Sequence, residues 1–259
     1  MAAAVVLASY FGFRLWSIER GSIQRTGSEA PSQWTPELQQ LWGPVLSSDR
    51  PLMLCLATLR GPEVGSFYGF TGVGTASGAF LLGQFLATRK QNVLLTRSDM
   101  LSLPEVTMDN VIFLGPSPAN RQIQALSAGQ QIVLEPEGIR NLNPRPGEPA
   151  FISDHSPKGV LDNEESHALI SHMPGIYGHG ELLYFSGNQI SSVMAAVQAF
   201  TDPTLARTLV SKLKTSAGFP RYYQVVLTVK SMDNMPIEIS YTLHRDLSSL
   251  KLQASAGRP

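Results

Sequence analysis

From Arg50 onward, short apolar runs alternate with helix-like stretches, and this alternation constrains the fold more than any other feature. The run at 51–58 is almost continuously apolar and lies between a proline and a Gly-Pro turn, which is typical of a strand in a parallel sheet. Similar runs predict strands at 92–97, 110–115, 131–135, 149–153, 167–172, 181–186, 222–230 and 236–244. The stretches between them predict helices at 75–88, 99–103, 118–128, 189–200 and 203–213. Together these patterns predict an α/β fold, with a three-layer, mostly parallel sheet of Rossmann or flavodoxin type.

Two segments depart from this alternation. Residues 136–165 are rich in Pro, Gly, Asn and Glu, and we expect a loop and hairpin excursion there. The last two strands are joined through Asp233 and Asn234, which predicts that the sheet ends in an antiparallel hairpin at its edge.

Composition excludes several classes of protein. The 259 residues are 43% apolar and 15% charged, which argues against a disordered chain. The 20 basic residues are balanced by 20 acidic ones, so the chain has no net positive charge. This balance argues against direct nucleic-acid binding, which needs a basic surface. The single cysteine, Cys55, lies inside an apolar strand-like run, and we expect it to be a core residue.

The N-terminus is an apolar segment without charge before Arg14. Its length of about 15 residues gives a helix of roughly 22 Å, which is short for a bilayer core of about 30 Å. Trp16 followed by Arg20 and Arg25 is typical of a helix leaving a membrane. We therefore expect 1–17 to be a signal anchor, truncated if the natural start lies upstream, and a single-pass membrane location. The alternative is a helix packed on the domain. The sequence does not determine on which side of the membrane the α/β domain would lie.

The remaining boundaries follow from composition. Residues 18–46 are polar and mixed, which predicts a juxtamembrane linker with a short helix at 36–42 that begins after Thr35 as N-cap. We expect the α/β domain at 47–246 and a flexible tail at 247–259.

Two strand-to-helix turns share one composition. Each has a glycine at the strand exit, followed by hydroxyl and amide side chains at a helix N-terminus. Unpaired backbone N–H groups and the positive end of the helix dipole suit an anionic or polar ligand there. The predicted ligand-binding residues are Gly115, Ser117, Asn120, Ser186, Gly187, Asn188 and Ser191. The alternative is that these serines and asparagines only cap helices.

Other motifs are weaker. Gly72, Gly74 and Gly78 give a G-x-G-x-x-x-G spacing, but it does not directly follow the first strand, and Arg97 stands where a dinucleotide site needs an acid. A tight glycine entry to a helix is the better interpretation. His167 and His172 are five apart on a strand and point to opposite faces, so no metal site is predicted. We predict no cofactor and no catalytic triad.

The succession NVIFLGPSPAN, ELLYFSGNQISSVMAAVQAFTDP and YYQVVLTVK resembles the C-terminal α/β domain of uncharacterised, membrane-anchored bacterial proteins of acidobacterial type. These proteins often carry an N-terminal winged-helix or helix-turn-helix region before one membrane span. The resemblance covers about residues 50–244 and is matched at Phe200-Thr201-Asp202-Pro203. It implies an anchor plus an extramembrane domain and no particular activity. Where the family has an acidic residue near Gly74, this chain has Thr75.

Three hypotheses for function remain. The first is a membrane-tethered, non-enzymatic ligand-binding or sensory domain, such as the sensor part of a transcriptional regulator, with a small polar or anionic ligand. The second is a structural or protein-interaction module that binds a partner through the terminal hairpin. The third is an enzyme acting on a nucleotide or sugar phosphate, with Ser117, Asn120 and Asn188 positioning it and Glu135 or Asp154 as the acid.

Overall fold

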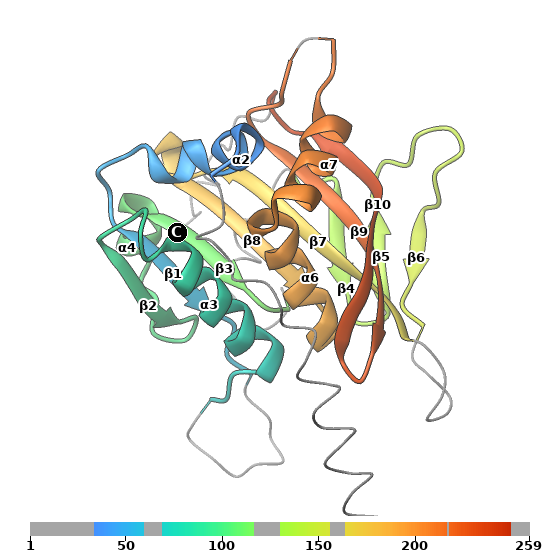
Figure 1. The fold of residues 1–259 in the computed structure, drawn as a ribbon, viewed down its shortest axis with the longest axis horizontal. Coiled ribbons are helices and arrows are strands. Elements are labelled where there is room, and N and C mark those ends of the chain that lie inside the picture. Colours follow the sequence, from blue (N-terminus) through green and yellow to red (C-terminus); the bar gives the residue numbers. More distant parts are fainter. Residues whose placement is uncertain (1–33, 60–68, 117–129, 156–163, 217, 250–259) are drawn as a thin grey trace, which may run out of the picture. The chain divides into compact units, whose positions relative to one another are not determined.

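The computed structural model describes residues 34–59, 69–116, 130–155, 164–216 and 218–249. They belong to one compact unit that begins at Trp34. A seven-stranded sheet runs through this unit, in the order β10-β9-β7-β8-β3-β1-β2 (Figure 1). Its strands are β1 (Leu52–Leu56), β2 (Val93–Arg97), β3 (Asn110–Leu114), β7 (Glu164–Pro174), β8 (Glu181–Gly187), β9 (Tyr223–Met232) and β10 (Met235–Asp246).

The sheet is mixed, so the prediction of a mostly parallel, Rossmann-like sheet is wrong. The four strands β2, β1, β3 and β8 are parallel to one another. In contrast, β7 is antiparallel to both of its neighbours, β8 and β9. The reason lies in the connection, because only residues 175–180 separate β7 from β8. A parallel pair needs a crossover of about a dozen residues or more, so this short turn forces an antiparallel pair.

The predicted terminal hairpin is confirmed. β9 and β10 pair antiparallel, and β10 lies at the edge of the sheet. Asp233 and Asn234 form the turn with φ angles of 51° and 62°. Two successive residues with positive φ match the right-handed twist of the strands they join, and Asp and Asn tolerate this conformation better than most residues.

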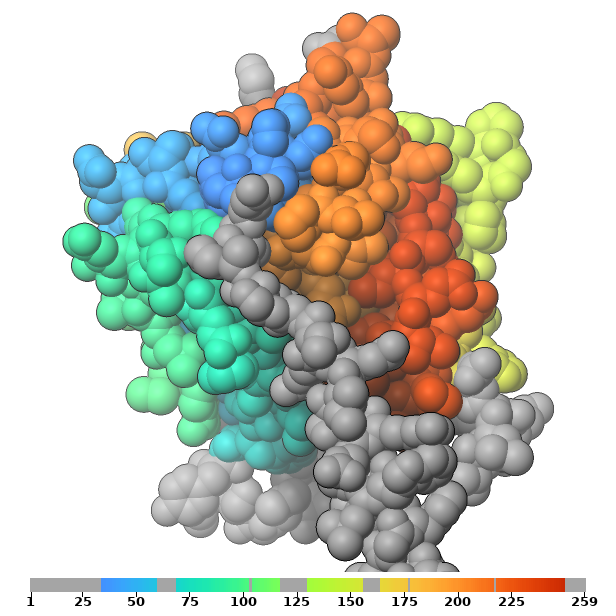
Figure 2. Space-filling model, in the orientation of Figure 1, coloured from blue at the N-terminus to red at the C-terminus, as the bar shows by residue number. Residues whose placement is uncertain are grey.

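Helices cover one face of the sheet. The helices of the described residues are α2 (Pro36–Leu46), α3 (Val73–Leu86), α4 (Leu103–Met108), α6 (Ile190–Thr201) and α7 (Pro203–Leu213). All except α4 pack their buried side chains into one core on the same face. Figure 2 shows this face, with α2 in blue beside α7 in orange. Val106 of α4 packs instead into a second core on the opposite face, with Met53 and Phe113.

A second, smaller sheet covers the other face of the antiparallel strands. It consists of β4 (Ile132–Glu135), β5 (Gly138–Asn141) and β6 (Phe151–Ser153). Ile132 and Ile139 of this sheet pack against Leu169, Val226 and Leu243 of the large sheet. The excursion predicted for 136–165 therefore contributes a covering layer, where a Rossmann fold would have helices.

The helix predicted at 36–42 is confirmed, as α2. The Thr35 side chain accepts a hydrogen bond from the backbone N–H of Leu38 and caps the helix. Trp42 is fully buried, and its Nε1 donates to the Phe200 carbonyl oxygen at 2.6 Å. Since the compact unit begins at Trp34, α2 belongs to the core of the domain.

The prediction of a single-pass membrane protein is corrected. Over the part of the chain that the structure describes, no helix is long and apolar enough to cross a bilayer. The longest of these helices, α3, has 14 residues, whereas a span takes about 20. Residues 1–17, which carried the prediction, lie outside the described part of the chain.

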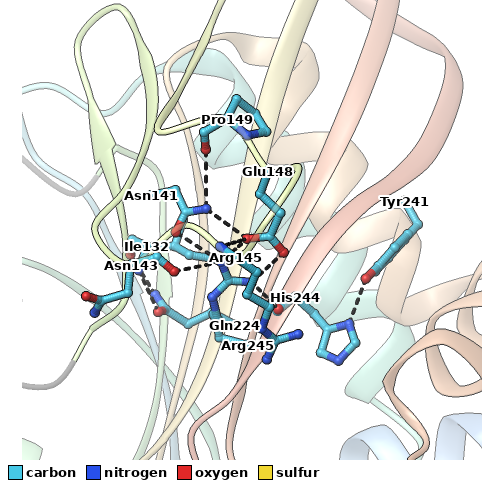
Figure 3. A network of polar contacts seen from close by, with 10 residues as sticks. All are labelled: Ile132, Asn141, Asn143, Arg145, Glu148, Pro149, Gln224, Tyr241, His244 and Arg245. Atoms are coloured by element: carbon cyan, nitrogen blue, oxygen red, sulfur yellow. Dashed lines mark hydrogen bonds and ion pairs between the residues drawn. The ribbon is translucent and has the colours of Figure 1, made fainter.

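A buried ion pair joins the small sheet to the end of β10 (Figure 3). The Arg245 side chain is only 2% exposed, and its guanidinium donates to Glu148 Oε1 at 3.0 Å and to Oε2. It also donates to Asn141 Oδ1 at 3.1 Å and to the Asn143 carbonyl oxygen at 3.2 Å. The hydrogen bonds from Arg245 lower the pKa of Glu148 to about 2. The loop between β5 and β6 is therefore held by charge as well as by packing.

Candidate functional site

A small cleft lies beyond the carboxyl ends of three parallel strands. Ala57 and Leu59 line it after β1, Pro116 lines it after β3, and Gly187 ends β8. Its volume is about 90 Å³. Among the described residues, the lining consists of Ala57, Leu59, Gly72, Gly74, Thr75, Pro116, Gly187, Asn188, Gln189, Ile190 and Val193.

The strand order explains why a cleft opens here. β1 pairs with β2 on one side and with β3 on the other. The helices that follow β1 and β2, α3 and α4, pack on opposite faces of the sheet. At such a reversal of strand order the connections diverge, and a crevice forms outside the carboxyl ends of the strands.

Two helix N-termini converge on the cleft. The N-cap of α3 is Gly72 and that of α6 is Gln189, and neither makes a side-chain capping hydrogen bond. The first-turn N–H groups of a helix have no partner within the helix, so both ends present donors and positive partial charge. The two ends lie close together, because a Cβ on Gly74 would stand 2.7 Å from Ile190 Cα. This close approach explains the glycine-rich entry to α3.

Thr75 adds a side-chain donor to the cleft. The residue is 3% exposed and lines the cleft from the first turn of α3. Its hydroxyl makes no hydrogen bond to any described residue, whereas Thr201 and Thr208 bond to carbonyl oxygens of their own helices. Gly115 stands next to it with a φ of +109°, and a Cβ there would lie 2.6 Å from Thr75 Oγ1. Thr75 is therefore a buried residue that lines the cleft and whose hydroxyl is available to a polar group there.

Asn188 joins the cleft to the small sheet. Its side-chain nitrogen donates to the Glu135 carbonyl oxygen at 2.6 Å and to the Pro136 carbonyl oxygen at 3.2 Å. The same nitrogen lies 3.1 Å from Asp154 Oδ2. Asp154 Oδ1 in turn accepts from the His167 backbone N–H and contacts His167 Nδ1, each at 2.9 Å. Asn188 thus lines the cleft while its amide group holds the turn between β4 and β5.

Of the other predicted ligand-binding residues that the structure describes, only Gly187 lines the cleft. Gly115 lies beside Thr75 without lining the cleft. Ser186 is buried within β8. Ser191 is fully buried, and its hydroxyl lies 3.4 Å from the Ser166 hydroxyl on β7. Ser117 and Asn120 lie outside the described residues.

The acids proposed for an enzyme are engaged elsewhere. Glu135 pairs with Arg140, and Asp154 contacts His167 and Asn188. Neither carboxylate lines the cleft, and the described lining contains no charged side chain. The described residues also include no group of three or more His, Cys, Asp or Glu placed to hold a metal.

A cluster of two buried residues, His172 and Glu181, and the exposed Arg221 lies at the opposite end of β8. His172 Nε2 is 2.9 Å from Glu181 Oε2, and Arg221 donates to the other oxygen of this carboxylate. Glu181 begins β8, whereas the cleft follows the last residue of the strand, Gly187. This cluster therefore takes no part in the cleft.

Sequence reasoning missed Thr75, Gln189 and Gly74 as cleft residues. The glycine-rich entry to α3 is the available signal, but its spacing predicts only a tight entry to a helix and no ligand site. No protein-family model matches this chain, and no curated protein matches it either. The geometry of the cleft is therefore the basis for a functional proposal.

Proposed function

We propose that this chain is a non-enzymatic ligand-binding domain with a sensory role, and that the cleft takes a small polar or anionic molecule. The observation that carries the proposal is the convergence of two helix N-termini without side-chain caps on one cleft. Unsatisfied N–H groups and two positive dipole ends favour an anion or a polar acceptor at this point. Thr75 supports the proposal with a further donor.

An enzyme is the weaker alternative. A general acid or base must come within hydrogen-bond reach of the reacting group. Glu135 and Asp154 do not line the cleft, and both are bonded to other residues. The polar groups described in the cleft can bind and orient a ligand, but none of them carries a charge for acid–base chemistry.

The test is a thermal-shift screen of the full chain against nucleotides, sugar phosphates, amino acids and small carboxylates. A ligand at 100 times its Kd stabilises the fold by about 2.7 kcal/mol, which corresponds to roughly 5–11 °C for a domain of this size. A saturable shift in at least one class supports the proposal. A flat screen from a well-folded chain would overturn it.

Two glycine variants locate the response. Gly74→Ala pushes the two helix ends apart, because the new Cβ meets the backbone of Ile190, and we expect it to abolish the shift. Gly83→Ala on the same helix adds a Cβ with nothing within 4 Å, and the shift should persist. A shift retained in Gly74→Ala would place the ligand elsewhere.

The second candidate is a protein-interaction module, and one observation favours it. β10 is an edge strand, and Met232, Met235 and Ile237 at the hairpin are 58%, 53% and 55% exposed. Against it, β10 contains Pro236 and two register shifts, which are devices that discourage edge-to-edge pairing. Sedimentation of the wild type and Ile237→Lys at increasing concentration tests self-association. A monomer in both cases would count against pairing between copies.

A further inference from the structure

We infer that the ligand of the cleft is a monovalent organic anion, with its carboxylate at the two helix N-termini and a short apolar body behind it. This inference rests on the proposed function and narrows it to one chemical class. It depends on three observations, which concern charge, the Thr75 hydroxyl and the apolar part of the lining.

The charge available in the cleft matches a monoanion. Each helix N-terminus is equivalent to about half a positive charge, so two ends supply about one. The described lining contains no Lys, Arg or His that would add to this charge. A dianionic phosphate is usually neutralised by Arg or Lys, which makes a carboxylate the better match.

Thr75 supplies an unused donor for a carboxylate oxygen. The residue is 3% exposed and lines the cleft, and its hydroxyl has no hydrogen-bond partner among the described residues. A hydroxyl can donate to an anion without adding charge, and such a charge-assisted hydrogen bond is stronger than one between neutral groups. The backbone N–H groups of the helix ends and the side-chain hydroxyl of Thr75 indicate the same kind of ligand.

The rest of the lining suits a short apolar body. Leu59, Ile190 and Val193 contribute branched side chains, and Ala57 and Pro116 complete the apolar wall. The volume of about 90 Å³ is well below the roughly 300–1,000 Å³ typical of pockets for drug-sized ligands. A short-chain carboxylate fits this size better than a nucleotide or a sugar phosphate does.

The experiment measures binding to the full wild-type chain by isothermal titration calorimetry, in low-salt buffer because exposed dipole interactions are screened. The probes are sodium butyrate, butyramide and inorganic phosphate. Butyramide has nearly the same shape as butyrate but carries no charge. We expect butyrate to bind at least about tenfold more tightly than butyramide, as the loss of charge-assisted hydrogen bonds predicts. We expect phosphate to bind more weakly than butyrate.

Three variants test the role of Thr75. Thr75→Val keeps the shape and removes the donor, and we expect it to weaken butyrate binding about tenfold. Thr75→Ser keeps a hydroxyl and should bind within about threefold of the wild type, a difference of less than 1 kcal/mol. Thr208→Val on α7 is the matched control, because its hydroxyl bonds Thr204 on an exposed helix surface. It should leave binding unchanged.

The outcomes separate the two proposals. Equal binding of butyrate and butyramide, or tighter binding of phosphate, overturns the assignment of a monoanion and leaves a ligand-binding cleft. The same holds if carboxylates fail while another class in the thermal screen binds. Only a flat screen across all classes removes the proposed function. The comparison of butyrate with butyramide uses the wild type, so it stands even if Thr75→Val fails to fold.

Discussion

The large sheet has an antiparallel half (β7, β9 and β10) and a parallel half (β2, β1, β3 and β8). The two halves differ in how their polar groups are hydrogen-bonded. In the antiparallel half, Arg245 pairs with Glu148, and His167 pairs with Asp154. Gln224 of β9 accepts from the backbone N–H groups of Gln131 and Ile132 and donates to the Ile132 carbonyl oxygen and Ser171. In the parallel half, the ends of α3 and α6 and the Thr75 hydroxyl stay open at the cleft.

This difference separates polar groups that stabilise the fold from those available to a ligand. The networks of Arg245, His167 and Gln224 are closed within the protein, and they hold the small sheet on the large one. Donors left open in the parallel half face a cleft that a ligand can enter. The Tyr184 and Tyr223 hydroxyls also lack partners among the described residues, and burial raises the pKa of both. Neither lines the cleft, so an open donor matters for binding only where a ligand can reach it.

The largest loss of stability on mutation is expected in the antiparallel half. Glu148→Gln should lower the free energy of unfolding by about 3 kcal/mol, because a buried guanidinium loses its carboxylate. Urea denaturation measures this loss. The control is Glu238→Gln, which breaks a pair with Lys230 whose side chains are 42% and 57% exposed, and it should cost less than about 1 kcal/mol. Equal losses would show that the buried pair has no special role.

The same pair should make stability depend on pH. The pKa of Glu148 falls from 4.5 to about 2 in the folded chain. A folded-state pKa below the unfolded value stabilises the fold above pH 4.5, and this stabilisation is lost as the pH falls towards 2. The stability gap between wild type and Glu148→Gln should therefore narrow over that interval. Urea titrations at several pH values check this, and a constant gap would contradict it.

In the parallel half, two glycines on one helix should respond in opposite directions. Gly74→Ala places a Cβ against the Ile190 backbone, and we expect a loss of about 2 kcal/mol from overpacking. Gly83→Ala has open space and should stabilise the chain by about 0.5–1 kcal/mol, since alanine favours a helix more than glycine does. Thermal unfolding of the two variants tests the close approach of α3 and α6. A neutral Gly74→Ala would show that the helix ends are further apart.

The smallest loss of stability is expected from a substitution at Asn188, which joins the end of β8 to the small sheet. Asn188→Ala removes the donor that holds the Glu135 and Pro136 carbonyl oxygens and should cost about 1 kcal/mol. Hydrogen exchange should accelerate in β4 and β5 and stay unchanged in β1. Asn143→Ala is the matched control, because only the backbone oxygen of Asn143 contacts Arg245. Unchanged exchange in Asn188→Ala would show that the small sheet is held without this contact.

Local patterns in the sequence were sufficient to place most elements. Asp202 followed by Pro203 predicted the start of α7, and the Asp202 carboxylate accepts from the Thr204 and Leu205 N–H groups. The short helix predicted at 99–103 was misplaced, because α4 begins at Leu103 with Ser102 and Glu105 forming a capping box. Capping signals act within one turn, so the sequence alone can reveal them.

The direction of β7 was missed because apolar continuity says nothing about strand direction. Its burial is nearly continuous, as in a parallel strand, since the small sheet covers the face that helices would otherwise cover. The short connection to β8 was the local signal for an antiparallel pair.

The sequence by itself determined where strands and helices form and which turns carry polar residues, because these depend on neighbours along the chain. Only the tertiary structure decided that Thr75 stands beside Gly115 and that Gly74 meets Ile190. It also decided that Asn188 bonds to the β4–β5 turn rather than standing free for a ligand. These contacts depend on strand order and helix crossing, and they join residues too far apart in the chain for local propensities to bring together.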